Sequence, residues 1–534
     1  MCQIRLNNTS VCGKMVNVDR IGSFNRKYSA FGLLLMVVLI LVPIASGASE
    51  GYRGFTSFLK DKALLKDCGF SVLHALACTL ASLILAIPGI AIYSRCRPGV
   101  RKFLRAVLAF AFFFPPVLMV LCFNNLFGRH GLLTVLRIPG LWKASILYCA
   151  YGIPIFIVMA GGHLRSLDIV KEETARSLGA SPLKVFFSIT FPGLRPALAG
   201  TGALVFLRIL TDSVIAHSFN DSSYSFDIQE KAYSFFLSGD RSYACTLSLV
   251  VMLIAVPVLV ILSAQEKKRD DLAGCGPHVR RSRGNSFTRF LSFLYMTVIC
   301  SVMILPVLGM IWTSLKGESG LTLASYRTLF SALNPNWLVA LGFVIAVTVA
   351  APLLCTPVSR SICVGLSSNG TGAFPALMPL AMGTLVISLG YGGILNFLPE
   401  TMPVKTVLIL CARILVLIPL QVMIILPVAR RIPVTLRETS ASLGVRSLRG
   451  FRRTDASIMR PAVHAAFFSS AALSVSLFGP DEIYGLNTVW SQIVRLMGYG
   501  DMTTSCTMGS TLIIICYIFF LLGTGHIREG GTDV

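Results

Sequence analysis

The chain has few charged residues and no polar stretch long enough for a sizeable soluble domain. Of its 534 residues only 13% are charged, whereas 54% are hydrophobic. A soluble fold could not bury so much apolar surface, and the solvent that accepts it is the lipid bilayer. The sequence therefore predicts an integral membrane protein.

Signals for catalysis and for cofactors are also missing. No Gly-x-x-x-x-Gly-Lys-Ser/Thr stretch occurs, so the chain lacks the loop that cradles nucleotide phosphates. No Ser/His/Asp or paired-carboxylate constellation rises above background. The fifteen cysteines are scattered, without a Cys-x-x-Cys pair or a Cys/His grouping. We expect no catalysis, disulfide framework, metal site or cofactor on this chain.

Apolar runs long enough to cross a bilayer, about 20 residues each, recur along the whole sequence. The first half is predicted to contain Phe31–Gly47, Phe70–Tyr93, Ala106–Phe127, Ala144–Gly161, Leu198–Ile215 and Tyr243–Ser263. The second is predicted to contain Phe290–Trp312, Trp337–Pro357, Phe374–Leu395, Val407–Val428, Val463–Phe478 and Cys506–Gly523. The predicted fold class is an all-α integral membrane protein of about twelve transmembrane helices, with six in residues 1–264, a linker over 265–289 and six in residues 290–534.

The net charge of +23 comes mainly from Lys and Arg in short loops between the apolar runs. A nucleic-acid partner would need a folded basic face, and we expect none; the positive-inside rule explains these loops better. It predicts a multi-pass membrane protein with both termini in the cytoplasm. A competing interpretation is a cleavable signal peptide, with Arg26, Lys27, the run to Pro43 and small residues at 45–48. We favour an uncleaved first span, because cleavage would break the match of six spans to six.

The two halves are tandem repeats in sequence. With one constant offset and no gap, Pro154 corresponds to Pro419 and Glu173 to Glu438. The same register pairs Arg165 with Arg430, Ser177-Leu178-Gly179 with Ser442-Leu443-Gly444, Phe186 with Phe451, and Arg195-Pro196 with Arg460-Pro461. Chance would rarely keep that register over so many positions. Because each half has an even number of spans, both repeats enter the membrane with the same orientation.

Each repeat carries a polar loop after its fourth span, at 163–197 and 429–462. In the first loop, Gly179 can adopt a positive φ and end a short helix. Ser181-Pro182 suits the N-cap and first position of a second helix, and Arg195-Pro196 marks the return to the membrane. The sequence predicts a compact amphipathic element outside the bilayer, on the cytoplasmic side.

This first loop resembles the permease subunits of binding-protein-dependent ABC importers, whose signature is Glu-Ala-Ala, three residues, Gly, nine residues and Ile-x-Leu-Pro. The residues that fit the spacing are Glu173, Thr174, Ala175, Gly179, Ile189 and Pro192. The resemblance implies a coupling helix that inserts into a groove on a separate ATPase subunit. It also implies that Glu173 pairs with a donor on that subunit.

The second loop keeps the signature less well. The matching residues are Glu438, Thr439, Ser440 and Gly444. Thr454 stands where the first loop has Ile189, and Ser457 where it has Pro192. Four arginines, Arg446, Arg449, Arg452 and Arg453, make it strongly basic. We therefore expect either unequal docking of the two loops or attraction of the second to anionic membrane lipid.

The resemblance covers nearly the whole chain and narrows to fused two-half permeases of the thiamine and ferric-iron type. Phe127-Gly128-Arg129-His130-Gly131 is similar to a turn of that group, and Leu477-Phe478-Gly479 with Met497-Gly498-Tyr499 favours the thiamine type. The implied partners are two copies of an ATP-binding subunit, which carries the ATP, and a periplasmic or lipid-anchored solute-binding protein. The solute expected is thiamine or a phosphorylated thiamine, with ferric iron as the alternative.

Two other classes compete with an ABC importer. An ion-coupled secondary transporter also suits twelve spans in two halves, but it leaves the paired loops unexplained. A membrane-embedded enzyme or scaffold would need polar clusters near one membrane face, which the sequence does not show.

Several polar groups fall within or between the predicted spans. Arg208 and Asp212, four residues apart on one helix face, either line the translocation path or form an internal packing pair. Arg413 is expected to extend toward the membrane surface. Prolines at 115, 116, 154, 379 and 419 are expected to kink their helices. The acidic residues Asp221, Asp227, Glu230, Asp240, Asp481, Glu482 and Asp501 are expected in solvated external loops, where a binding protein could meet them.

Overall fold

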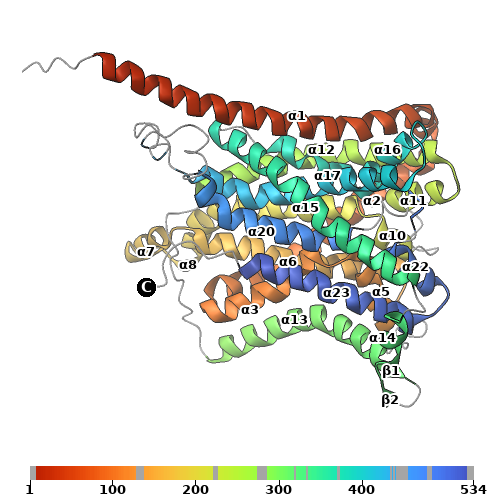
Figure 1. Cartoon of the computed structure of the whole chain (residues 1–534). Helices are drawn as coiled ribbons and strands as arrows, with labels where there is room; N and C mark the ends of the chain where they lie inside the picture. The colour runs from red at the N-terminus through yellow and green to blue at the C-terminus, as the bar shows by residue number, and fades with distance from the viewer. Residues whose placement is uncertain are drawn as a thin grey trace, which may run out of the picture.

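A computed structural model describes residues 8–127, 138–219, 227–272, 286–317, 320–331, 335–369, 373–432, 436, 439, 455–477, 484–486 and 488–525. Almost all of these residues are helical, and the helices run roughly side by side in one bundle (Figure 1). The predicted all-α membrane fold is confirmed. One end of the bundle carries α7 (Ile169–Ser177) and is called the α7 end; the other carries α11 (Ile228–Leu237) and is called the α11 end.

The first half contains most of the short helices. Its elements are α1 (Asn8–Lys60), α2 (Lys62–Arg95), α3 (Pro98–Leu108), α4 (Phe110–Phe113), α5 (Pro116–Phe127), α6 (Gly140–Ser166), α7, α8 (Pro182–Val185), the π-helix η1 (Phe186–Thr190), α9 (Phe191–Leu210), α10 (Val214–Ser218), α11 and α12 (Arg241–Leu272).

The second half repeats the long helices. Its elements are α13 (Ser286–Leu315), β1 (Lys316–Gly317), β2 (Gly320–Leu321), α14 (Ala324–Leu329), α15 (Pro335–Asn369), α16 (Phe374–Ile394), α17 (Met402–Arg430), α20 (Asp455–Ser476), α22 (Val489–Gly498) and α23 (Met502–Gly525). The two short strands pair antiparallel, with Lys316 opposite Leu321.

Ten described helices are long and apolar enough to cross a membrane, and an eleventh crossing is counted if the bent pair formed by α3–α4 and α5 is one span. The remaining predicted span corresponds to α20, which has 22 residues and is not among them. Its four buried serines, together with Arg460 and His464, lower its mean hydropathy. Packing explains this composition, since α20 lies against α15, α17 and α23.

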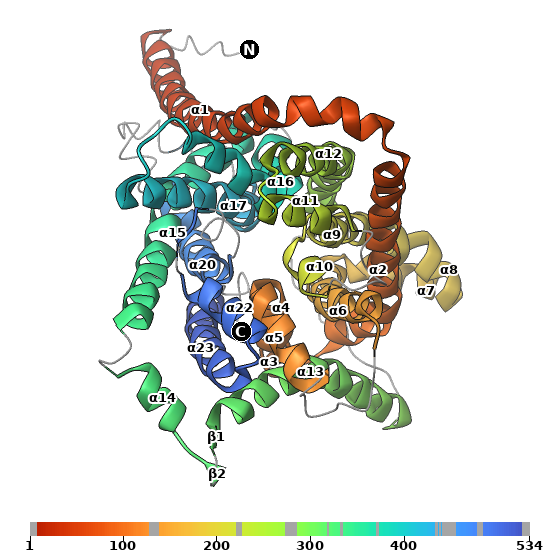
Figure 2. The ribbon, with the colours of Figure 1, turned by 90° about the vertical axis from the view of Figure 1, so that its right-hand side faces the viewer.

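The first helix of each half packs on the other half. Helix α1 contacts α12 of its own half, but it also lies along α15 and α16 (Figure 2). Likewise α13 contacts α23 of its own half and α5 of the first half. Small residues allow this approach: a Cβ on Gly390 of α16 would collide with the backbone of Pro43 in α1. The halves are therefore held together by exchanged helices.

The third span of each half is broken rather than straight. In the first half, α3–α4 and α5 meet at an angle of 103° around Phe114 and Pro115, so the kink predicted at Pro115 and Pro116 within the span Ala106–Phe127 is confirmed. Proline at 115 and 116 removes backbone donors there. In the second half, Gly383 has φ 65° and ψ 172° inside α16. Only glycine adopts that conformation readily.

Candidate functional site

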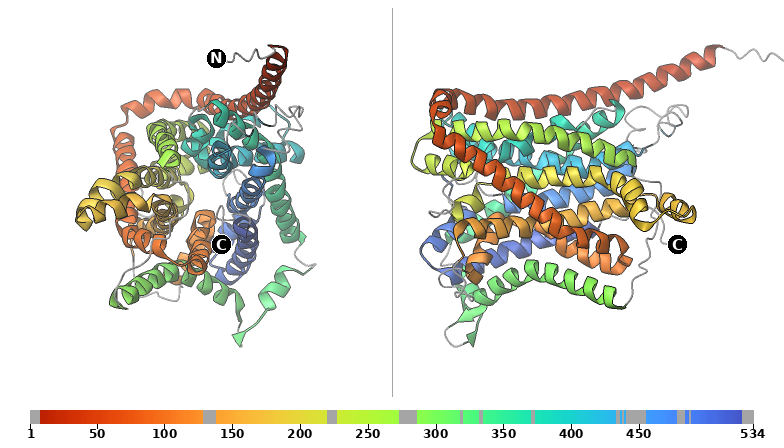
Figure 3. Two further views of the ribbon diagram at one scale, coloured as in Figure 1. Left: turned by 90° about the vertical axis from the view of Figure 1, so that its left-hand side faces the viewer. Right: turned by 180° about the vertical axis from the view of Figure 1, so that it is seen from behind.

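The α7 end carries a helical hairpin, formed by α7, α8 and η1, that projects beyond the other helices except α1 (Figure 3). Asp168 caps α7, because its side chain accepts a hydrogen bond of 3.0 Å from the Val170 backbone N–H. Gly179 ends the helix with φ 85°. The N–H groups of Gly179 and Ala180 donate to the carbonyls of Arg176 and Ala175, each at 3.0 Å. The predicted break at Gly179 is confirmed.

The second arm of this hairpin begins where the sequence predicts. The Ser181 hydroxyl accepts a hydrogen bond of 3.4 Å from the Lys184 N–H, and Pro182 occupies the first helical turn. From Pro182 the helix continues without interruption through η1 into α9, as far as Leu210. Because the arm and the fifth span form one helical segment, displacement of the hairpin would be transmitted to α9.

Glu172, which sequence reasoning did not single out, fixes the two arms together. It is 5% exposed, and its Oε1 accepts a hydrogen bond of 2.8 Å from the Thr190 hydroxyl. Its Oε2 lies 3.9 Å from an Arg176 guanidinium nitrogen. A buried carboxylate that bridges α7 and η1 is a positioning residue for the hairpin.

The neighbouring Glu173 is exposed, as is Thr174, while Ala175 is half-buried. The same surface shows large apolar side chains that a solvated hairpin would not need, with exposed fractions of 83% for Leu178, 71% for Leu183 and 63% for Phe187. Exposed large apolar side chains grouped in this way make the hairpin a candidate protein-docking surface. We call Glu173, Leu178, Leu183 and Phe187 the docking surface.

The other predicted coupling residues are placed less prominently. Ile189 is half-buried in η1, and Pro192 is exposed in the first turn of α9. In the second loop Thr439 is exposed. Glu438, Ser440 and Gly444 lie outside the described residues, as do the four arginines at 446, 449, 452 and 453.

A second polar site lies where α9 ends inside the bundle. Arg208 and Asp212 approach with 3.9 Å between Nη1 and Oδ1, so the structure brings the predicted pair together. Asp212 is 4% exposed. Its Oδ2 accepts a hydrogen bond of 2.8 Å from the Ile215 N–H and one of 3.3 Å from the Tyr148 hydroxyl of α6. Asp212 therefore joins three elements: α9, α10 and α6.

Arg208 differs from its partner in being accessible. Its side chain keeps 32% of its surface exposed, and the guanidinium lies 5.7 Å from the centroid of the Tyr151 ring. Next to it, Thr211 contacts the broken third span of the other half, because a Cβ on Gly383 would lie 2.8 Å from Thr211 Cβ. The break in α9 and the break in α16 thus meet between the two halves.

In the second half, Arg413 stands at the position that corresponds to Tyr148. The expectation that its side chain extends toward the membrane surface is wrong. Arg413 is fully buried in α17, and its Nη1 donates a hydrogen bond of 2.7 Å to the Ser474 carbonyl of α20. Burial is possible because the serine-rich face of α20 supplies polar acceptors. Gln421 of α17 uses the same face, donating to the Ser470 hydroxyl at 2.8 Å.

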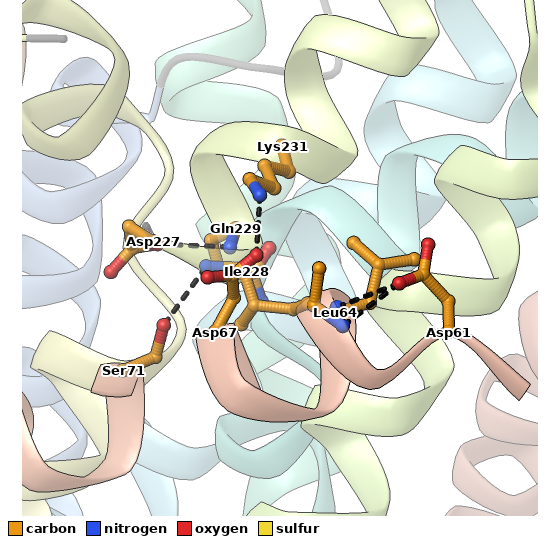
Figure 4. Close-up of polar contacts among 9 residues, drawn as sticks. Asp61, Leu64, Asp67, Ser71, Asp227, Ile228, Gln229 and Lys231 are labelled. Carbon is orange, nitrogen blue, oxygen red and sulfur yellow. Dashed lines mark hydrogen bonds and ion pairs between the residues drawn. The ribbon is translucent and has the colours of Figure 1, made fainter. Parts of the chain in front are cut away.

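At the α11 end, α11 is clamped onto α2 by polar contacts (Figure 4). Lys231 of α11 forms an ion pair with Asp67 of α2, which is 4% exposed. The Ile228 N–H donates to the Ser71 hydroxyl at 2.9 Å. The side chain of Asp227 caps α11 by accepting from the Gln229 and Glu230 N–H groups at 2.9 and 3.2 Å.

The expectation that Asp227 and Glu230 lie in a solvated loop is wrong, because α11 packs on α2 and α12; their exposed fractions are 8% and 3%. Burial raises the pKa of Asp227 to about 7, against the lowering effect of hydrogen bonds from the Glu230 and Gln229 backbone, and the charges of Asp212 and Glu230 raise it further. Asp240 and Asp501 are exposed helix caps, whereas Asp221, Asp481 and Glu482 lie outside the described residues.

Within the described residues no group of three or more His, Cys, Asp or Glu side chains could hold a metal ion. Sequence analysis did not identify Glu172, Tyr148, Asp67 or Lys231 as positioning residues. The hydrogen bond between Glu172 and Thr190 joins residues that are 18 positions apart, so no local sequence pattern identifies them as partners.

Comparison with known proteins adds independent evidence. Residues 79–270 match the family described as binding-protein-dependent transport system inner membrane component. This segment runs from α2 to α12, so it includes the docking surface and the Arg208–Asp212 pair.

Some relatives match nearly the whole chain, and others match half of it or less. The thiamine transport system permease protein ThiP of Brucella suis biovar 1 is 20% identical over 511 residues, which is 91% of this chain and 93% of that protein. The spermidine/putrescine permease protein PotC of Shigella flexneri is 23% identical over 259 residues, 47% of this chain but 95% of PotC. The putrescine permease protein PotI of Escherichia coli K12 is 32% identical over 189 residues, 33% of this chain and 63% of PotI. The chain is thus about two PotC lengths long and about one ThiP length.

Proposed function

Because residues 79–270 match the binding-protein-dependent transport system inner membrane components, we propose that this chain is the permease subunit of an ABC importer and that it moves thiamine or a phosphorylated thiamine into the cytoplasm. The driving force is ATP hydrolysis on a separate subunit. The observation that carries this proposal is the match to the thiamine transport system permease protein ThiP over 91% of this chain and 93% of that protein.

The docking surface is proposed to receive the ATPase subunit. Glu173 offers an accessible carboxylate, and Leu178, Leu183 and Phe187 offer apolar area that a partner can bury. We assign the equivalent role in the second half to Glu438, Thr439, Ser440 and Gly444. Two ATPase copies, one for each loop, follow from the repeat.

We assign the α7 end, at which α1 begins and α23 ends, to the cytoplasm, as expected for both termini. The α11 end then faces a periplasmic or lipid-anchored solute-binding protein. ATP binding draws the two loops together, and because the first hairpin is continuous with α9, the motion reaches the helix break at Asp212. Arg208 and Asp212 are proposed to line the path that opens there.

Uptake of labelled thiamine tests the solute directly. Cells that lack only this gene should lose ATP-dependent thiamine uptake and regain it with the wild-type gene. If they take up thiamine normally and lose ferric iron or polyamine uptake instead, the solute assignment is wrong. Uptake that persists after ATP depletion and collapses with the ion gradient would contradict ABC coupling and support a secondary transporter.

A further inference from the structure

A large apolar groove lies on the side of the bundle, between α2, α6 and α13. Its volume is about 590 Å³. Leu73 and Leu85 of α2, Trp142 of α6 and Val302 of α13 line it with exposed fractions of 65%, 52%, 63% and 46%. All three helices are membrane spans, so this groove opens sideways into hydrocarbon rather than into water.

The polar groups in the groove wall satisfy one another. The Ser145 hydroxyl donates to the Leu141 carbonyl at 2.8 Å, so the His74 Nε2, 2.9 Å from Ser145 Oγ, is the donor to that oxygen. The rest of the lining consists of aliphatic, aromatic, Ala, Pro, Cys and Met side chains. The groove therefore presents an apolar surface and calls for an apolar occupant.

The equivalent surface of the other repeat is covered by a helix. Helices α2, α6 and α13 correspond to α15, α17 and α1 of the other repeat. There α1 packs closely along α15, with Gly32 so near Ser361 that a Cβ would collide with its hydroxyl. In the first half α13 stays away from α2 and α6, which touch it at few points. The space that α1 fills on one side is left open on the other.

We propose that this groove is a binding site for one acyl chain of a membrane phospholipid, which takes the place that α1 occupies in the second half. No described helix other than α2, α6 and α13 lines the groove, and a helix is about 10 Å in diameter. A single extended chain is far thinner, and membrane lipid is the only apolar molecule always present at this depth.

The bound chain would contact residues that lead to the helix break at Asp212. The His74 ring lies edge-on to the Tyr148 ring, with 5.9 Å between centroids. Tyr148 in turn donates its hydroxyl to Asp212 at 3.3 Å. An acyl chain against His74 would thus hold Tyr148 in the position where it bonds Asp212.

Native mass spectrometry of the purified full-length chain tests this site. The protein would be exchanged into detergent containing dioleoyl phosphatidylglycerol as the only lipid, and the number of retained lipids counted. Ala81→Phe with Ala150→Phe fills the groove from α2 and α6. We expect the wild type to keep one lipid that the filled variant lacks, with occupancy at least tenfold lower.

A matched variant, Val349→Phe with Leu353→Phe, places the same rings on exposed positions of α15 and should leave the count unchanged. Ala81→Leu, a smaller change, should lower occupancy in part and guards against misfolding of the double variant. Equal lipid counts in wild type and in both groove variants, with unchanged melting temperatures, would overturn the proposal. Because the readout needs neither ATPase nor solute, it is independent of the thiamine assignment.

Discussion

The fourth and fifth spans of both halves are joined by a polar contact at the same place in the repeat, but the charge sits on different helices. In the first half, Tyr148 of α6 donates to Asp212 at the end of α9. In the second, Arg413 of α17 stands where Tyr148 does and donates to Ser474 of α20. The repeat thus preserves a joint between two helices rather than a particular pair of residues.

The two joints differ in what they leave accessible. Arg413 is fully buried, whereas Arg208 keeps 32% of its side chain exposed beside a buried Asp212. Leu473 and Leu477 occupy the second-half positions of Arg208 and Asp212. A buried joint serves packing, and a half-exposed ion pair at a helix break is available to a solute or to a moving helix.

The largest effect is expected when Asp212 is replaced by leucine, which is the residue at the equivalent position, 477, of the second half. Asp212→Leu removes the acceptor of the Tyr148 hydroxyl and of the Ile215 N–H, each at a cost of about 1–3 kcal/mol when buried. We expect solute uptake to fall at least tenfold and the melting temperature to fall with it.

The double variant Arg208→Leu with Asp212→Leu separates the two roles of this pair. If the pair lines the path, the double variant should regain part of the stability but none of the uptake. Recovery of uptake together with stability would mean that the pair only packs the helices.

A smaller effect on stability is expected at the N-termini of α11 and α22, the helices that lie between the fifth and sixth spans of the two halves. Asp227 caps α11 with a buried carboxyl whose pKa is raised to about 7, whereas the side chain of Thr488 makes no cap hydrogen bond at α22. The folded protein then holds a proton that the unfolded chain releases near pH 4. The free energy of unfolding should therefore decrease as pH rises from about 4 to 7, by at most about 4 kcal/mol.

Asp227→Asn keeps a good cap but cannot ionise, so this pH dependence should flatten. Thermal unfolding in detergent at pH 5 and pH 8 measures the difference. A variant that is as pH-sensitive as the wild type would show that other groups dominate, and Thr488→Asn should leave the pH dependence unchanged.

The buried arginine should matter more to stability than the exposed one. Arg413→Met removes a charged donor bonded at 2.7 Å, worth about 1.5–3 kcal/mol. Arg208→Met removes a half-exposed partner 3.9 Å from its carboxylate, worth about 1 kcal/mol or less. Urea or thermal unfolding of the two variants side by side gives the order, and the reverse order would contradict the burial argument.

The smallest effect is local to the hairpin. Gly179→Ala places a Cβ at φ 85° and should cost about 1–2 kcal/mol in the α7–α8 turn. Gly162→Ala in α6 is the control, because it has ordinary helical geometry and open space around the added Cβ. Faster amide exchange at Ala180 in the first variant only would identify the turn as the site of strain.

The sequence predicted the helices and the hairpin well because both depend on local signals. Apolar runs located the spans, and Gly179 with Ser181-Pro182 located the two arms. It failed where distant helices decide the outcome. The burial of Arg413 depends on serines of another helix, and the burial of Asp227 depends on α11 packing against α2. The break at Gly383 gave no signal, since glycine is common in membrane helices.

Co-purification tests the central claim most directly. Tagged permease extracted from its native membrane should bring down an ATP-hydrolysing subunit, and Glu173→Lys with Glu438→Lys should abolish that association. Asp240→Lys, a charge change on an exposed residue at the α11 end, should leave the association intact. A double variant that still retains the ATPase and transports solute at the wild-type rate would contradict the account.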